Sequence, residues 1–166
     1  MRINAKLTLL AATLALSCVF GSVAAGQDRI ATLRARFSQE SDPIRKAKLM
    51  QDLGTAEFQE IAKDFQADKL SDALAMVRQY RDEARSSLND LDAKNIDAEK
   101  HPAGFKQLQF SLRASLRRLG DLLVTLTRDE QEPFESTRKD IEEMDRHLIH
   151  ELFPRQAAGD ELKTKT

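Results

Sequence analysis

Hydrophobic residues recur at steps of three and four along most of the chain, which is the spacing of amphipathic helices. Five such stripes can be traced, covering residues 30–41, 42–65, 68–97, 102–126 and 134–152. No stretch alternates steadily between apolar and polar residues, and Val, Ile and Tyr, which favour strands, are sparse. The pattern therefore predicts an all-α fold.

Prolines and capping residues indicate where the helices begin and end. The prolines stand at the boundaries of the stripes, with Pro43, Pro102 and Pro133 before a helical pattern and Pro154 after one. Asp42 is placed to cap the second helix, and Asp129 with Glu132 has the spacing of a capping box for the fifth. Gly54 interrupts the second stripe, and the pattern leaves open whether the helix breaks there.

Each predicted helix has one apolar stripe, so each needs neighbours on that side. Short connections favour antiparallel packing. We therefore expect an up-and-down bundle of about four main helices plus a short N-terminal helix. Two fragments leave a second arrangement open: 42–54 resembles the start of a HEAT-type repeat, and 68–74 resembles the inter-helix turn of a tetratricopeptide (TPR) repeat. These resemblances imply stacked helical hairpins.

The N-terminus has the three parts of a secretory signal peptide. Arg2 and Lys6 precede a nearly uncharged run over 7–20, and Val23-Ala24-Ala25 offers the small residues of a cleavage site. The apolar run is shorter than the ~20 residues that span a bilayer. We expect a signal peptide over 1–25, cleavage near Ala25, a helical domain over 26–154 and a flexible polar tail over 155–166. The residues before Cys18 do not follow the order of a lipoprotein signal, so lipid anchoring there is not expected.

The charge balance excludes a strongly basic nucleic-acid-binding protein. Removal of 1–25 lowers the count of Lys and Arg from 26 to 24 against 27 acidic residues, which leaves a net charge of −3. The only cysteine also lies in that segment, so the remaining chain has neither disulfides nor thiolate ligands. These features suit a secreted or periplasmic domain that is held together by its core.

Candidate chemistry is sparse. Gly-x-Ser-x-Gly and His-Glu-x-x-His are both missing from the sequence, and no motif indicates an enzyme or a cofactor. Glu143, His147, His150 and Glu151 have helical spacing that could gather metal ligands. Both histidines point away from the apolar stripe of their helix, so we interpret the group as solvated side chains and predict no metal.

One helix face combines basic and aromatic residues. On a helical wheel Lys106, Arg113 and Arg117 lie at about 80–120° from Phe105, and Phe110 lies beside them at about 140°. This basic strip (Lys106, Phe110, Arg113 and Arg117) is a candidate interaction surface for an acidic protein, a phosphate-bearing polymer or a membrane surface. The alternative is that the strip packs against an acidic neighbouring helix and that Phe110 fills a second seam.

Together these observations predict an exported, non-enzymatic helical protein that acts as a binding or scaffolding module in the cell envelope. Its expected partners are another protein or a second copy of itself. The alternative function is that of a periplasmic stress chaperone or a metal-responsive accessory protein.

Overall fold

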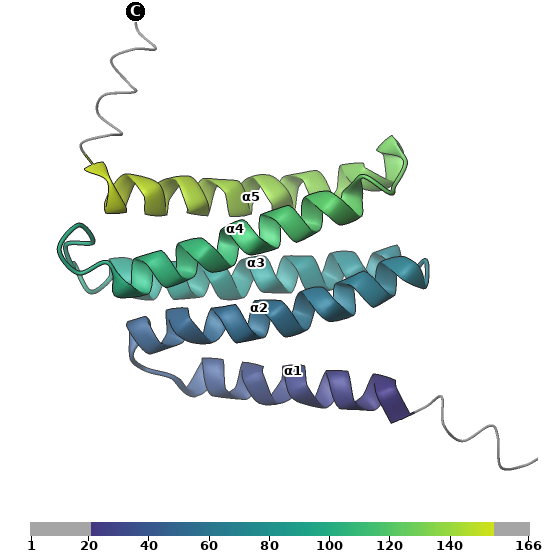
Figure 1. The fold of residues 1–166 in the computed structure, drawn as a ribbon, viewed down its shortest axis with the longest axis horizontal. Helices are drawn as coiled ribbons and strands as arrows, with labels where there is room; N and C mark the ends of the chain where they lie inside the picture. Colours follow the sequence, from purple (N-terminus) through teal and green to yellow (C-terminus); the bar gives the residue numbers. More distant parts are fainter. Residues whose placement is uncertain (1–20, 155–166) are drawn as a thin grey trace, which may run out of the picture.

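The structure, a computed structural model, describes the backbone of residues 21–154 and the side chains of 26–154. The described part contains five α-helices and no strand (Figure 1). Their bounds are α1 Gly21–Gln39, α2 Pro43–Gln66, α3 Leu70–Asp92, α4 Ala103–Leu123 and α5 Arg128–Leu152. The predicted all-α fold is therefore confirmed. Most of the expected signal peptide, including Cys18, and the expected tail over 155–166 lie outside the described residues.

The four long helices α2 to α5 form two antiparallel hairpins, α2–α3 and α4–α5, which stack on each other (Figure 1). Ser111 of α4 bonds to Met50 of α2, and Ile44 lies against Gly104, so α2 and α4 run in the same direction side by side. The helix α3 pairs with α5 in the same way, while α1 packs outside on α2. The predicted bundle of four main helices plus one is confirmed, and within it the hairpins are stacked.

Several helix bounds differ from the prediction. The first helix begins at Gly21 rather than at 30, so it continues through the expected cleavage site near Ala25. The third helix ends at Asp92 rather than at 97, because residues 93–95 turn and Asn95 adopts a left-handed conformation with φ 50°. The fourth helix ends at Leu123 rather than at 126.

The caps give one correct and one wrong prediction. Asp42 caps α2 by accepting a hydrogen bond from the Arg45 amide at 2.8 Å. The capping box of α5 is formed by Thr127 and Glu130, not by Asp129 and Glu132. The side-chain amide of Gln131 donates to the carbonyl oxygens of Leu123, at the end of α4, and Leu126, in the turn that follows. These two contacts favour a start of α5 before Pro133. Pro133 consequently lies inside α5 instead of before it.

The helix α2 runs unbroken through Gly54, which marks a close contact between helices rather than a break. A Cβ atom on Gly54 would lie 2.8 Å from Cε2 of Tyr80, a buried residue of α3. The Tyr80 hydroxyl lies 3.3 Å from Oγ of Ser111, and Ser111 in turn donates to the Met50 carbonyl at 3.1 Å. Burial raises the pKa of Tyr80 to about 12. Three helices are thus joined at one point by a buried hydrogen-bonded chain.

The apolar stripes meet in a single core. Its fully buried members include, from α2 to α5, Met50, Leu53, Ile61, Val77, Leu91, Leu108, Leu112, Leu119, Ile141 and Leu148. Such complete burial makes truncation of these side chains costly, because a cavity remains where the atoms were.

Leu112→Ala and Leu119→Ala should each lower the free energy of unfolding by about 2–5 kcal/mol, since both leucines are fully buried in α4. His147→Ala should cost less than about 1 kcal/mol, because this side chain is 43% exposed. Chemical denaturation monitored by far-ultraviolet circular dichroism measures all three. A larger loss for the histidine variant would contradict the assignment of buried and exposed faces.

Gly54→Ala should also destabilise the protein, by about 1–3 kcal/mol, because the added methyl group forces Tyr80 away from α2. Gly120→Ala is the matched control: Gly120 lies in α4, and a Cβ there meets nothing within 4 Å. That control should raise stability by up to about 1 kcal/mol through helix propensity. Equal effects of the two substitutions on the thermal midpoint would show that Gly54 has no packing role.

Candidate interaction surface

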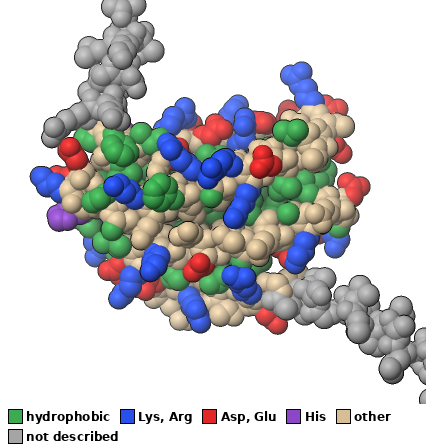
Figure 2. All heavy atoms as spheres, in the orientation of Figure 1, with side chains coloured by type: hydrophobic (Ala, Val, Ile, Leu, Met, Phe, Trp, Pro, Cys, Tyr) green, Lys and Arg blue, Asp and Glu red, His purple; other side chains and the backbone are tan. Residues whose placement is uncertain are grey.

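The outer face formed by α2 and α4 carries the candidate surface. Figure 2 shows Lys and Arg side chains gathered over α4 on this face, with hydrophobic side chains between them. The helix α4 contains four basic residues, Lys106, Arg113, Arg117 and Arg118, and one acidic residue, Asp121. The hydrophobic stripe on its opposite side is buried in the core, so the basic side chains are directed outward.

The structure places Lys106, Phe110, Arg113 and Arg117 on the exposed side of α4. Phe110 is 62% exposed, so the alternative that it fills a second seam is wrong. The expected packing against an acidic helix does apply to Arg113, whose Nε lies 3.3 Å from Oδ1 of Asp145 in α5. Arg113 therefore forms an ion pair between α4 and α5, whereas Lys106 and Arg117 form no ion pair with any described residue.

Arg118 belongs to this surface but was missed by the sequence analysis. On the wheel it lies at about 220°, outside the angular range of the basic strip. In the fold that angle faces α2, where Arg118 contributes to two hollows. The sequence offered one signal, since Arg118 directly follows Arg117. It did not indicate on which side of α4 the helix α2 lies.

A furrow follows the line between the parallel helices α2 and α4. Its smaller hollow, of about 100 Å³, is lined by Gln51, Gly54, Thr55, Phe110, Ser111, Ala114, Ser115 and Arg118. Its larger hollow, of about 340 Å³, is lined by Phe58, Gln59, Ala62, Arg118, Asp121 and Leu122. Arg118 lies between the two hollows because it lines both. The surface thus combines an exposed aromatic ring, cations without an ion pair among the described residues, a small hollow of mixed lining and a larger, mainly apolar hollow.

The candidate metal ligands of α5 are not gathered into a metal site. Nε2 of His147 lies 3.1 Å from Asp92 of α3, and His150 is exposed. Among the described residues, no three His, Cys, Asp or Glu side chains are arranged to hold a metal ion.

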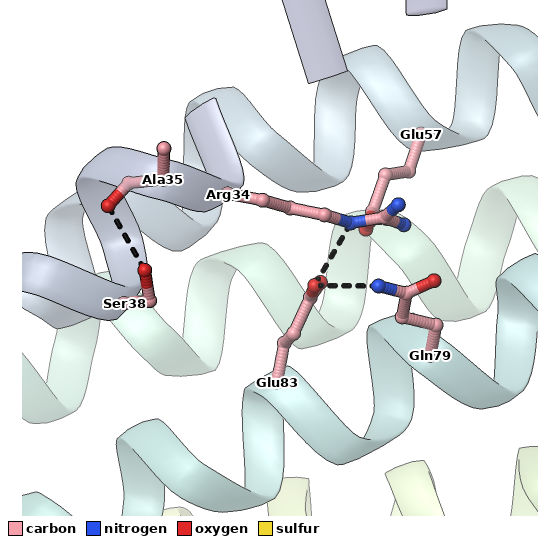
Figure 3. Close-up of polar contacts among 6 residues, drawn as sticks. All are labelled: Arg34, Ala35, Ser38, Glu57, Gln79 and Glu83. Carbon is pink, nitrogen blue, oxygen red and sulfur yellow. Dashed lines mark hydrogen bonds and ion pairs between the residues drawn. The ribbon is translucent and has the colours of Figure 1, made fainter. Parts of the chain in front are cut away.

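A partly buried ionic cluster was also missed by the sequence analysis (Figure 3). Arg34 of α1 contacts both Glu57 of α2 and Glu83 of α3, and Gln79 donates to Glu83 at 3.4 Å. Glu57 is fully buried. A signal existed, since Glu57 occupies a position in the apolar stripe of its helix, four residues before Ile61. A carboxylate at such a position needs a partner, but the sequence did not indicate which residue provides it.

Comparison of the chain with protein-family models, with curated proteins and with solved structures yields no match. Within the described residues, no helix has both the length and the apolar character needed to span a membrane. The function has to be inferred from the side chains and the surfaces described above.

Phe110→Ala should change the free energy of unfolding by less than about 1 kcal/mol, because most of the ring is in water. Phe105→Ala is the matched control on the same helix, where the ring is 2% exposed, and it should cost about 3–5 kcal/mol. Denaturant titration of both variants checks the difference. A loss of several kcal/mol for Phe110→Ala would mean that the ring serves the core.

Proposed function

We propose that this protein is exported and acts as a non-enzymatic binding or scaffolding module of the cell envelope, with the α2–α4 face as its binding surface. One observation carries the proposal: Phe110 is 62% exposed on a helix whose other large apolar residues, up to its end at Leu123, are buried or partly buried. Neither the core nor the helix turns require an aromatic residue at this position.

The chemistry of the face suits a protein partner. Aromatic and arginine side chains are enriched among the residues that dominate binding energy in protein interfaces. Here Phe110 lies about two helix turns from Arg117 and Arg118, and the larger hollow has a mainly apolar lining that can receive an apolar side chain. Arg118 stands between the two hollows, where it can pair with a carboxylate of the partner. We therefore propose an acidic segment with interspersed apolar residues as the ligand.

A membrane surface fits this face less well. A lipid headgroup layer would contact the cations but would leave the furrow unfilled, and Asp121 in the larger hollow would face the anionic phosphates. A folded or extended peptide can place an apolar residue in the hollow that Asp121 lines and keep its carboxylates beside Arg117 and Arg118. The geometry therefore favours a protein partner, and binding to anionic vesicles is an outcome that the experiment below distinguishes.

Export is supported by the arrangement of residues around Ala25. Among the described side chains of α1, over residues 26–39, the buried ones are Ile30 and Phe37, and cleavage after Ala25 would retain both. Mass spectrometry of the protein expressed with its own N-terminus, and recovered from the envelope fraction, tests this part. A mature chain starting at Gly26 is expected, and an uncleaved protein in the cytosol would refute export.

Arg117→Glu combined with Arg118→Glu should reduce partner capture at least tenfold, because a carboxylate then faces the acidic ligand. Envelope extract passed over immobilised protein, with quantitative mass spectrometry of the bound proteins, measures this loss. Arg29→Glu with Arg78→Glu is the matched control: it makes the same change in net charge on exposed positions of α1 and α3.

The control should keep capture within about twofold of the unmodified protein, and both double variants should retain their helical spectra. An equal loss of partner capture in the two double variants would mean that net charge, and not the α2–α4 face, controls binding. The unmodified protein is also tested for binding to anionic phospholipid vesicles. If it binds them and captures no protein through Arg117 and Arg118, the partner is a membrane surface and not a protein.

A further inference from the structure

The first helix is attached to the bundle by a small apolar contact, one ionic cluster and a cation–π contact in which Nζ of Lys46 lies 4.8 Å from the centre of the Phe37 ring. Of its described side chains only Ile30 and Phe37 are buried, with Leu33 packed partly against the core. Its sequence connection to α2 is short, over residues 40–42. An open groove of about 660 Å³ separates α1 from α3, and Arg34 and Glu83 line it. The ionic cluster is thus the main polar link between α1 and the other helices.

The geometry of this cluster leaves one carboxylate without its own cation. Nη2 of Arg34 lies 2.5 Å from Oε1 of Glu57, and its Nε lies 3.0 Å from Oε1 of Glu83 (Figure 3). The other oxygen of each carboxylate, Oε2, is buried and has no hydrogen-bond partner. The fully buried carboxylate of Glu57 and the mostly buried one of Glu83 therefore share a single guanidinium, and a proton on Glu57 would spare the site a second negative charge.

The other groups around Glu57 do not supply the missing positive charge. From α3 it faces Glu83 and the Tyr80 hydroxyl, which stays protonated. On α4 the hydroxyls of Ser111 and Ser115 lie beside the Tyr80 hydroxyl and carry no charge. Arg34 of α1 is the cation in contact. Burial first, and then the charge of Glu83, raise the pKa of Glu57 to about 8, while Arg34 acts in the opposite direction.

We propose that α1 is a proton-controlled helix: it is docked on α2 and α3 while the Glu57 carboxyl holds a proton, and its docking weakens when Glu57 loses that proton. Loss of the proton places two negative charges against one arginine, with the Glu57 side chain fully buried and that of Glu83 mostly buried. Detachment of α1 removes the attraction of Arg34, but it also lets water reach Glu57, and burial acts more strongly on this carboxyl than Arg34 does. The apolar contacts of Ile30, Leu33 and Phe37 remain the same at either charge.

The sign of the pH dependence follows from linkage. When α1 leaves, Glu57 becomes hydrated and its pKa falls toward the ordinary value of 4.5, well below the docked value of about 8. Protonation therefore favours docking: the stabilisation is complete below pH 4.5 and is lost as the pH rises to about 8. Within this window the docking equilibrium constant should fall by up to about tenfold per pH unit.

Hydrogen exchange of the full chain between pH 5.5 and 9 tests this inference. After correction for the intrinsic exchange rate, protection of the α1 amides should fall with rising pH relative to protection of the α3 amides. Glu57→Gln should abolish this difference, since a neutral amide cannot ionise. Glu135→Gln is the control, because it removes a carboxylate from α5, outside the cluster, and should leave the pH dependence intact.

Glu83→Gln is the second variant if Glu57→Gln perturbs folding as judged by circular dichroism. It removes the second-largest influence that raises the pKa of Glu57, so the pH dependence of α1 protection should weaken. Protection of α1 that stays constant or rises with pH would overturn the inference. So would a pH dependence that survives undiminished in both Gln variants. None of these outcomes depends on partner capture by the α2–α4 face, so this proposal and the proposed function can fail separately.

Discussion

The close approach of three helices at Gly54 determines how the rest of the chain is arranged. Without a side chain on Gly54, the Tyr80 ring can lie directly against α2, and its hydroxyl reaches Ser111 on α4. Ser111 also bonds to the Met50 carbonyl, which holds α4 alongside α2 in the same direction. A buried hydroxyl without these partners would cost about 1–3 kcal/mol, so the contact also selects against other registers of the helices.

This parallel pairing creates the surface on which the proposed function depends. Because α4 buries its leucine stripe, the opposite side of the helix presents Phe110, Arg117 and Arg118 to solvent beside α2. The furrow between the two helices then adds concave space next to these side chains. On an antiparallel neighbour the same residues of α4 would face different residues of α2, and neither hollow would have its present lining.

The helices themselves could be predicted from the sequence, but the relations between them could not. Periodicity and the Asp42 cap are local, and they correctly indicated the five helices. Amphipathic stripes are interchangeable, so they do not reveal that Gly54 accommodates Tyr80 or that Arg118 faces a furrow. Two pairs of residues had the spacing of a capping box before α5, and the turn contacts of Gln131 favour Thr127 with Glu130. Glu57 was visible as an acid on an apolar stripe, but its partners come from two other helices.

The most direct test of this account is the direction of α4 relative to α2, measured as distances between spin labels by pulsed electron paramagnetic resonance. One label replaces Lys48 near the start of α2, and the second replaces either Lys106 or Asp121 at opposite ends of α4, with Cys18 changed to Ser. Positions 106 and 121 are separated by about 22 Å along a helix. The account requires the 48–106 distance to be clearly the shorter one. A shorter 48–121 distance would mean that the helices are antiparallel and would contradict the fold, the furrow and the proposed binding surface together.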